Sequence, residues 1–202
     1  WLVIKRKSHR TKVWLFLVCF LISSAVVFAV DVVFDKGLEQ HQKDRIEVLL
    51  GKKEDLKGVG YNVNQSKIAI GSGGFLGKGF LNGTQTKYNF VPEQDTDFIF
   101  CTIGEEWGFI GSSITIILFL TLCIRLVKMA ERQRSKFARI YGYGVASIIF
   151  FHFFVNIGMT IGLLPVIGIP LPFISYGGSS LWAFTLLLFI FIRQDASRLE
   201  LI

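Results

Sequence analysis

The sequence predicts an all-α polytopic membrane protein with four transmembrane helices and a large loop outside the membrane between the first two. Its 202 residues are 51% hydrophobic and include 20 Phe, and the mean hydropathy of +0.51 exceeds that of most soluble domains. Uncharged stretches occupy residues 13–30, 107–124 and 140–192. A helix of a soluble protein needs a polar face, and residues 13–30 have none, which disfavours a soluble helical bundle.

The lengths of these stretches predict the number of crossings. Each of the first two is 18 residues long, roughly 27 Å as a helix, which is near the thickness of a bilayer core. The third is too long for one crossing and contains Pro165, Pro170, Pro172, Gly177 and Gly178, so it is predicted to form two helices. The expected spans are residues 13–34, 107–127, 140–164 and 176–193.

Basic residues predict the orientation of the spans. Five precede the first span and six fill the link between the second and third: Lys5, Arg6, Lys7, Arg10, Lys12, Arg125, Lys128, Arg132, Arg134, Lys136 and Arg139. Segments 1–12, 128–139 and 194–202 are therefore expected in the cytoplasm, and loop 35–106 and turn 165–175 on the opposite side. Residues 31–106 hold 12 acidic and 9 basic residues, so the overall charge of +7 reflects membrane topology and not nucleic-acid binding.

The cysteines and the start of the chain give weaker signals. The three cysteines, Cys19, Cys101 and Cys123, are scattered and offer neither a disulfide framework nor a metal-binding spacing. No small-residue cleavage site follows the first apolar run, so we expect a membrane span there and not a signal peptide. We expect the chain to be the later part of a longer membrane protein.

The long outer loop contains two segments with a recognisable pattern. Residues 38–50 place apolar side chains at helical spacing and predict an amphipathic helix on the membrane or on the rest of the protein. The stretch "IGSGGFLGKGF", residues 70–80, lacks the first Gly and the Ser or Thr of a phosphate-binding P-loop. Its glycines favour either a substrate surface shaped by the backbone or a plain flexible loop.

A group of carboxylates precedes the second span in "FVPEQDTDFIFCTIGEEWGFIG", residues 90–111. Its acids are Glu93, Asp95, Asp97, Glu105 and Glu106. Desolvation and mutual repulsion in such a group raise a carboxylate pKa and suit it to act as a general base. Alternatively, Thr96 or Asp97 caps a short helix.

Two long motifs resemble the SEDS family (shape, elongation, division and sporulation), and most closely its RodA branch. They are "NQSKIAIGSGGFLGKGFLNGTQTKYNFVPEQDTDFIFCTIGEEWGFIG" and "FVNIGMTIGLLPVIGIPLPFISYGGSS". The resemblance implies a ten-helix protein of the bacterial cytoplasmic membrane, of which this chain resembles the last four helices. It also implies a peptidoglycan glycosyltransferase that polymerises lipid II during cell elongation, with a class B penicillin-binding protein as partner.

The same resemblance implies roles for individual residues. The essential acid of the family falls on Asp97, as general base or as ligand of a divalent cation such as Mg or Mn. Asp95 departs from the family pattern and is expected to raise the pKa of Asp97. Expected substrate contacts are Lys67, Lys78, Glu93, Glu105, Glu106, Ser175, Gly177 and Gly178. Expected structural or cavity-lining residues are His152, Asn156, Pro165 and Pro172.

The lysines of the outer loop and the polar residues within the predicted spans allow more than one role. Lys67, Lys78 or Lys87 are candidates to stabilise a leaving diphosphate. His152 and Asn156 share a helix face, and His152 is expected either to hydrogen-bond between helices or to line a lipid path. Besides polymerisation, the sequence therefore allows a lipid II flippase and a scaffold that only anchors the penicillin-binding protein.

Overall fold

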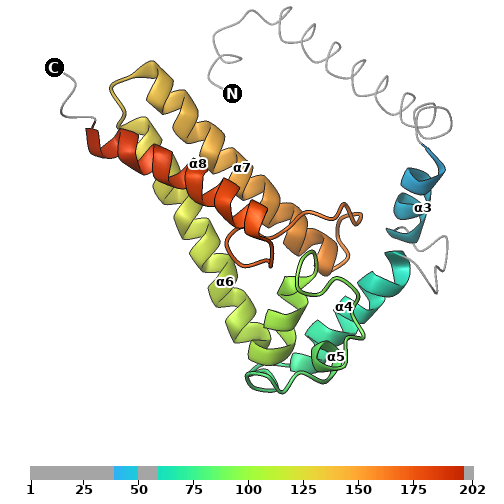
Figure 1. Ribbon diagram of the computed structural model, residues 1–202. Helices are drawn as coiled ribbons and strands as arrows, with labels where there is room; N and C mark the ends of the chain where they lie inside the picture. Colours follow the sequence, from blue (N-terminus) through green and yellow to red (C-terminus); the bar gives the residue numbers. More distant parts are fainter. Residues whose placement is uncertain (1–38, 50–58, 198–202) are drawn as a thin grey trace, which may run out of the picture. The chain divides into compact units, whose positions relative to one another are not determined.

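The computed structural model describes residues 39–49 and 59–197, and every regular element within these ranges is a helix (Figure 1). The prediction of an all-α chain is confirmed for these residues. The basic segment 1–12 and the predicted span 13–34 lie outside the described residues. The elements are α3 (Gln40–Leu49), α4 (Val59–Gly73), α5 (Thr84–Lys87), α6 (Ile99–Glu131), α7 (Lys136–Thr160) and α8 (Gly178–Ala196).

Helix α3 confirms the helix predicted in residues 38–50. The backbone N–H of Glu39 donates to Oε1 of Gln42 at 3.1 Å, which satisfies one of the donors that a helix start leaves unpaired. The amide of Gln40 reaches Asp44 one turn later at 3.5 Å. The proposed docking of this helix on a membrane stays a prediction.

Two described helices, α6 and α7, are long and apolar enough to cross a membrane, with mean hydropathies of 2.2 and 1.6. Only 17% of the apolar window of α6 is buried, and its outward side chains include Ile114, Ile117 and Leu118. A core helix of a soluble protein would bury such residues, so this exposure favours contact with lipid. The span predicted at 176–193 forms helix α8, but its crossing stays a prediction.

The helix ends differ from the predicted spans. Helices α6 and α7 extend into the predicted loop 128–139 and leave only a four-residue turn, because Lys and Arg are good helix formers. Helix α7 ends at Thr160 and not at residue 164, because Gly162 has a φ of 72° and the N–H groups of Leu163 and Leu164 both turn back to the carbonyl of Gly158. Pro165 then prevents a restart.

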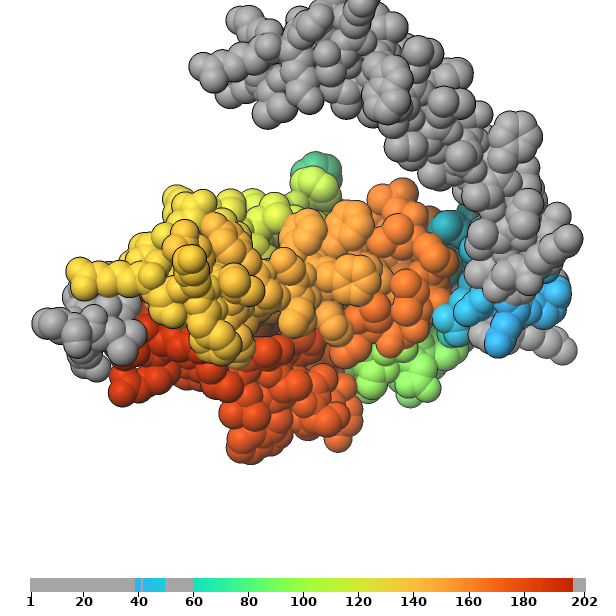
Figure 2. All heavy atoms as spheres, turned by 90° about the horizontal axis from the view of Figure 1, so that it is seen from above, coloured from blue at the N-terminus to red at the C-terminus, as the bar shows by residue number. Residues whose placement is uncertain are grey.

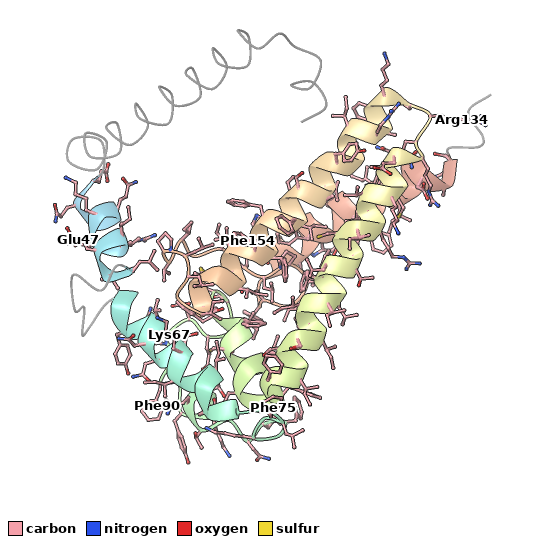
Figure 3. All side chains as sticks on the ribbon, turned by 180° about the vertical axis from the view of Figure 1, so that it is seen from behind. Glu47, Lys67, Phe75, Phe90, Arg134 and Phe154 are labelled. Atoms are coloured by element: carbon pink, nitrogen blue, oxygen red, sulfur yellow. The ribbon has the colours of Figure 1, made fainter. Side chains whose placement is uncertain are left out.

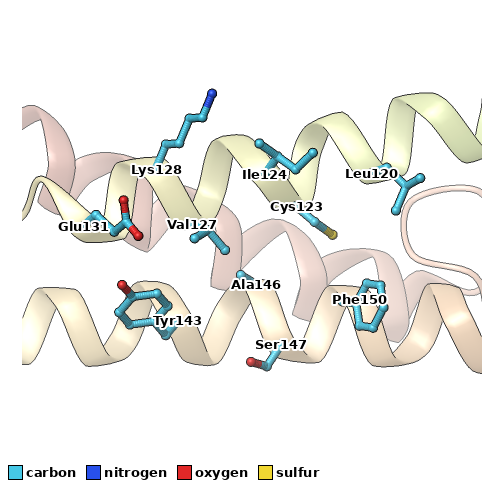
Figure 4. A pocket seen from close by; sticks show the side chains of 10 residues that line it. All are labelled: Leu120, Cys123, Ile124, Val127, Lys128, Glu131, Tyr143, Ala146, Ser147 and Phe150. Atoms are coloured by element: carbon cyan, nitrogen blue, oxygen red, sulfur yellow. The ribbon is translucent and has the colours of Figure 1, made fainter. Parts of the chain in front are cut away.

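The main core lies where α6, α7 and α8 pack together. Phe119 of α6 stacks on Phe153 of α7 with ring centroids 4.9 Å apart, and α7 and α8 lie side by side in two views (Figure 1, Figure 2). Gly142 of α7 allows a close approach to α8, because an added Cβ would lie 2.4 Å from the ring of Phe191. On another side, α6 and α7 border an apolar groove of about 520 Å³ between Leu120 and Tyr143 (Figure 4).

Helix α6 is broken at Gly108, whose φ of 62° and ψ of −157° are not helical. A break of this kind frees backbone donors after it and acceptors before it. The glycine-rich segment 74–79 satisfies them. The four hydrogen bonds run from Lys78 N to Glu105 O (3.0 Å), Gly79 N to Glu106 O (2.9 Å), Phe109 N to Gly74 O (2.9 Å) and Ile110 N to Phe75 O (3.3 Å).

Gly77 of this segment and Gly73 just before it are required, because the two backbones lie very close together. An added Cβ would lie 2.0 Å from the Gly104 carbonyl oxygen if placed on Gly73, and 2.1 Å from the Glu106 carbonyl oxygen if placed on Gly77. The sequence predicted either a substrate-facing backbone or a flexible loop. In the structure two glycines of residues 70–80, Gly73 and Gly77, lie against the backbone of α6. Residues 70–73 of this stretch form the end of helix α4.

Gly77→Ala tests this packing. Gly77 combines the 2.1 Å clash with a φ of 80°, so we expect the substitution to lower the free energy of unfolding by about 1–3 kcal/mol. Thermal unfolding of the detergent-purified full-length protein measures the change. Gly71→Ala is the control, since an added Cβ there meets nothing within 4 Å and Ala favours a helix. Equal melting temperatures for Gly77→Ala and the unmodified chain would show that the close approach does not hold the fold.

Candidate functional site

The carboxylate of Glu105 fixes the outer segments onto α6. Its side chain has no exposed surface, and its two oxygens accept five hydrogen bonds. The donors are Ser72 Oγ (3.4 Å), Lys78 Nζ (2.7 Å), Thr84 Oγ1 (3.2 Å), Gln85 N (2.9 Å) and Thr86 N (2.9 Å). A buried carboxylate is tolerated only with such compensation, so Glu105 acts as the centre of a structural network.

This network also engages Lys78, which the sequence placed at the substrate diphosphate. Its ammonium pairs with Glu105 at 2.7 Å and donates to the hydroxyl of Thr84 at 2.7 Å. Both interactions lie within the protein, and the lysine side chain is 26% exposed. The geometry therefore favours structural roles for Glu105 and Lys78 over the predicted substrate contacts.

Asp97 lies in the turn directly before α6. The turn is built on the carbonyl of Glu93, which accepts the backbone N–H groups of Thr96 (3.3 Å), Asp97 (3.0 Å) and Phe98 (3.2 Å). Glu93 reaches this geometry with a φ of 54°, an uncommon backbone conformation for a residue with a Cβ. The carboxylate of Asp97 borders Gly168, where an added Cβ would lie 3.1 Å from Oδ2.

The alternative role of Asp97 or Thr96 as a helix cap is wrong. The N-cap residue of α6 is Phe98, and no side chain forms a capping hydrogen bond there. The hydroxyl of Thr96 instead contacts the carbonyl and carboxylate of Glu93, each at 3.3 Å. The carboxylate of Asp97 is therefore not used to start the helix.

Three consecutive carbonyls, those of Asp95, Thr96 and Asp97, are held by groups far away in sequence. Asn156 of α7 donates its amide to the carbonyls of Asp97 (2.8 Å) and Ile169 (2.7 Å). The hydroxyl of Ser175 donates to the carbonyl of Thr96 (2.5 Å), and the N–H of Tyr176 donates to the carbonyl of Asp95 (2.8 Å). We call this arrangement of Asn156, Ser175 and Tyr176 around residues 95–97 the carbonyl clamp.

The clamp gives Ser175 a different role from the expected substrate contact, and it agrees with the structural one of the two roles expected for Asn156. Asn156 is fully buried and Ser175 is 8% exposed. The hydroxyl of Ser175 also accepts the N–H of Leu171 at 2.8 Å. Both side chains are therefore positioned to hold the segment that carries Asp97, which favours positioning over substrate contact for Ser175 and over a cavity lining for Asn156.

The surroundings of Asp97 raise the pKa of its carboxyl group above the ordinary value of 3.8. Burial is the largest cause, repulsion by the Glu93 carboxylate adds to it, and the hydroxyl of Thr96 acts in the opposite direction. The sequence predicted Asp95 as the repelling neighbour. In the structure the turn brings Asp97 back to Glu93, whose carbonyl accepts its N–H at 3.0 Å, and the repelling carboxylate is that of Glu93.

A pocket of about 280 Å³ opens beside this turn. Its lining includes Glu93, Asp95, Thr96 and Tyr176. Glu93 and Asp95 are exposed, so both can meet a ligand there. This placement agrees with the predicted contact role of Glu93, which stays a prediction.

Lys67 of α4 lies near the same outer segment. A Cβ added to Gly162 would lie 2.4 Å from its Nζ atom, so the ammonium borders the chain between α7 and α8, as Asp97 does at Gly168. Figure 3 shows Lys67 and Phe90 at the end of the molecule opposite Arg134. Lys67 therefore brings positive charge to the side of the molecule that carries Asp97.

The other predicted residues are less directly involved. Glu106 is 8% exposed and its carbonyl bonds the glycine-rich segment. Gly177 precedes α8 and Gly178 begins it. Pro172 is buried and Pro165 half-buried. The ring of His152 contacts Phe184 edge-on at 4.9 Å, and its Nδ1 atom forms no hydrogen bond within the described part of the chain.

Metal binding was the alternative role for Asp97. Within residues 39–49 and 59–197, no three His, Cys, Asp or Glu side chains lie together as metal ligands. The carboxylate of Glu105 is moreover fully engaged by internal donors. These side chains do not form a complete donor set for a divalent cation.

Some functional features were missed by sequence reasoning. The break at Gly108 was hidden, because a single Gly in an apolar run is compatible with a continuous helix. Thr84 and Thr86 lie in a polar stretch without a pattern. The only signal for the carbonyl clamp was a pair of polar residues, Asn156 and Ser175, in otherwise apolar segments.

Comparison with known proteins places this geometry in context. The sequence profile of the FtsW/RodA/SpoVE family, described as cell cycle proteins, matches residues 1–199. The peptidoglycan glycosyltransferase MrdB of Escherichia coli strain K12 is 47% identical over 144 residues, which cover 71% of this chain and 39% of that protein. The peptidoglycan glycosyltransferase RodA of Treponema pallidum is 43% identical over 145 residues, which cover 72% of this chain and 34% of that protein.

A solved structure, described as the structural coordination of polymerization and crosslinking by a peptidoglycan synthase complex, contains a chain with a similar fold. The TM-score is 0.70 and the sequence identity 28%, over 92% of this chain and 50% of that chain. The chain thus spans less than half the length of the two curated relatives.

Asn156→Leu tests the carbonyl clamp. Leu has a similar volume but cannot donate, so the carbonyls of Asp97 and Ile169 lose a partner, at a cost of about 1–3 kcal/mol for each buried group left unpaired. We expect faster amide hydrogen exchange in a peptide covering residues 93–98. His152→Phe, one turn away on the same helix, is the control and should leave that exchange unchanged. Unchanged exchange in Asn156→Leu would mean that the clamp does not restrain Asp97.

Proposed function

Because the chain belongs to the FtsW/RodA/SpoVE family of cell cycle proteins, we propose that it is part of a peptidoglycan glycosyltransferase. Its substrate is lipid II, the undecaprenyl-diphosphate-linked disaccharide peptide, and its product is the glycan strand. The similarity to MrdB and RodA, both named peptidoglycan glycosyltransferases, supports this activity. The proposed role in cell elongation follows from the resemblance of the sequence motifs to the RodA branch.

The observation that carries the proposal is the position of Asp97. Its half-buried carboxylate lies just before the N-terminus of α6. Arg132 and Arg134 lie just after the C-terminus of the same helix. Since basic residues mark the cytoplasmic side of a span, Asp97 and the segment from residue 59 to residue 106 face outward. Lipid II is polymerised on that side of the bacterial cytoplasmic membrane, according to the family resemblance.

In the proposed reaction, Asp97 acts as general base. A sugar hydroxyl attacks the anomeric carbon of a second lipid II molecule; the new C–O bond forms as the bond to the lipid diphosphate breaks. The hydroxyl proton passes to a carboxylate oxygen of Asp97, and the bonding pair leaves with the diphosphate. Positioned proton transfer of this kind contributes roughly 10²- to 10⁴-fold to rate. A raised pKa makes the carboxylate a stronger base, which suits this role.

The leaving diphosphate requires positive charge. Lys67 is the favoured group, because it lies beside the segment that borders Asp97, whereas Lys78 is already paired with Glu105. The pocket between Glu93 and Tyr176 is the proposed place for part of the substrate. A divalent cation held jointly with the diphosphate is the alternative role for Asp97, and no step above depends on it.

A class B penicillin-binding protein is the proposed partner. The related solved chain comes from a complex described as coordinating polymerization and crosslinking, which supports this assignment. A flippase function is less well supported, because Asn156 was one of the polar residues that favoured it and its amide is used in the carbonyl clamp. A scaffold function would leave Asp97 without a reason to be half-buried.

Asp97→Asn in the full-length protein with its partner is the direct test. Asn preserves the size of the side chain but accepts a proton far less readily, so we expect glycan polymerisation to fall by at least about 100-fold. Membrane insertion and thermal unfolding should remain unchanged. Labelled lipid II and gel separation of the glycan products measure the effect.

Asp95→Asn is the matched control for this experiment. It lies two residues away in the same turn and is exposed, and it should retain polymerase activity. Normal polymer from Asp97→Asn would contradict the base role and shift support to the flippase or scaffold function.

A further inference from the structure

A groove between α6 and α8 combines an apolar floor with cationic side chains. It has a volume of about 600 Å³, within the range of roughly 300–1,000 Å³ typical of small-molecule sites. Its apolar lining is Leu122, Leu126, Met129, Leu188 and Ile192, and its charged lining is Arg125, Lys128 and Arg132. No acidic side chain lines it.

The charges in this groove are only partly neutralised. Arg132 forms an ion pair with Asp195 of α8, and its Nε donates to the same carboxylate at 2.9 Å. Within the described part of the chain, neither Arg125 nor Lys128 forms an ion pair or a side-chain hydrogen bond. The side chain of Lys128 points away from α7 (Figure 4). Two cations thus remain for a ligand.

The combination of charge and apolar surface selects the occupant. An apolar transmembrane helix would desolvate Arg125 without supplying a counter-ion, which is costly within a membrane. A phospholipid with a negatively charged headgroup supplies an acyl chain for the leucine-lined floor and a phosphate for the cations. Basic pockets between transmembrane helices on the cytoplasmic side bind lipid headgroups in this way.

We propose that the α6–α8 groove is a binding site for an anionic phospholipid of the cytoplasmic leaflet. The phosphate lies between Arg125 and Lys128, and an acyl chain extends along Leu122, Leu126 and Leu188. The ion pair of Arg132 with Asp195 holds the C-terminal ends of α6 and α8 together beside the groove. The inference rests on the membrane placement of these helices and is independent of the catalytic role of Asp97.

The test measures lipid binding by the detergent-purified full-length protein with native mass spectrometry. Phosphatidylglycerol is titrated against phosphatidylcholine of identical acyl composition. We expect the unmodified chain to prefer phosphatidylglycerol and Arg125→Gln to bind it about fivefold more weakly, the effect of one cation near a headgroup. Arg139→Gln is the matched control and should bind phosphatidylglycerol normally. It removes an exposed charge near the turn between α6 and α7, and the Arg139 side chain does not line the groove.

A second variant tests the apolar floor. Leu188→Trp leaves the charge unchanged but fills the space along α8, so it should also weaken phosphatidylglycerol binding. Inorganic phosphate should fail to displace the lipid. Thermal unfolding confirms that each variant is folded. Equal losses in Arg125→Gln and Arg139→Gln, equal affinity for the two lipids, unaltered binding by Leu188→Trp, or displacement by phosphate would each overturn the proposal.

Discussion

The break in α6 at Gly108 is stable only because another segment satisfies the backbone groups that it frees. Segment 74–79 supplies two donors and two acceptors, and each such group left unpaired would cost about 1–3 kcal/mol. The exchange requires two backbones to touch, which explains the glycines at positions 77 and 108. Glu105 secures the same junction through its side chain. The part of α6 between the Asp97 turn and Gly108 is therefore held in two ways, by the backbone of segment 74–79 and by the side chain of Glu105.

The carbonyl clamp completes the positioning from the other side. Hydrogen bonds from α7 and from the chain before α8 hold residues 95–97, so two segments distant in sequence define one short turn. Because the backbone of this turn is fixed, Glu93 and Asp97 are held close to each other in the chain fold. Burial and repulsion then act together on the pKa of Asp97. The same contacts that build the outer end of the molecule thus set the basicity of the proposed catalytic group.

The sequence predicted the features that depend on local pattern. The apolar runs identified α6 and α7, the prolines and glycines after Thr160 marked the interruption before α8, and the acids around Asp97 indicated a polar site. Contacts across the chain could not be predicted in this way. Glu105 resembled its neighbour Glu106 as a substrate contact, and only the fold reveals that Lys78 and α5 enclose it. Likewise, the repulsion by Glu93 and not by Asp95 depends on the backbone path of the turn, which residue types alone do not determine.

The pH dependence of glycan polymerisation tests most directly whether the ionisation of Asp97 controls the reaction. The carboxylate form accepts the proton, so activity should be lost as the pH falls through the raised pKa of Asp97. In the full-length protein with its partner, the acidic limb of the rate profile is therefore predicted above the ordinary aspartate value of 3.8. Glu93→Gln removes a repelling negative charge, lowers the pKa of Asp97 and should move that limb to lower pH. A limb that stays in place or moves to higher pH in Glu93→Gln would contradict the account.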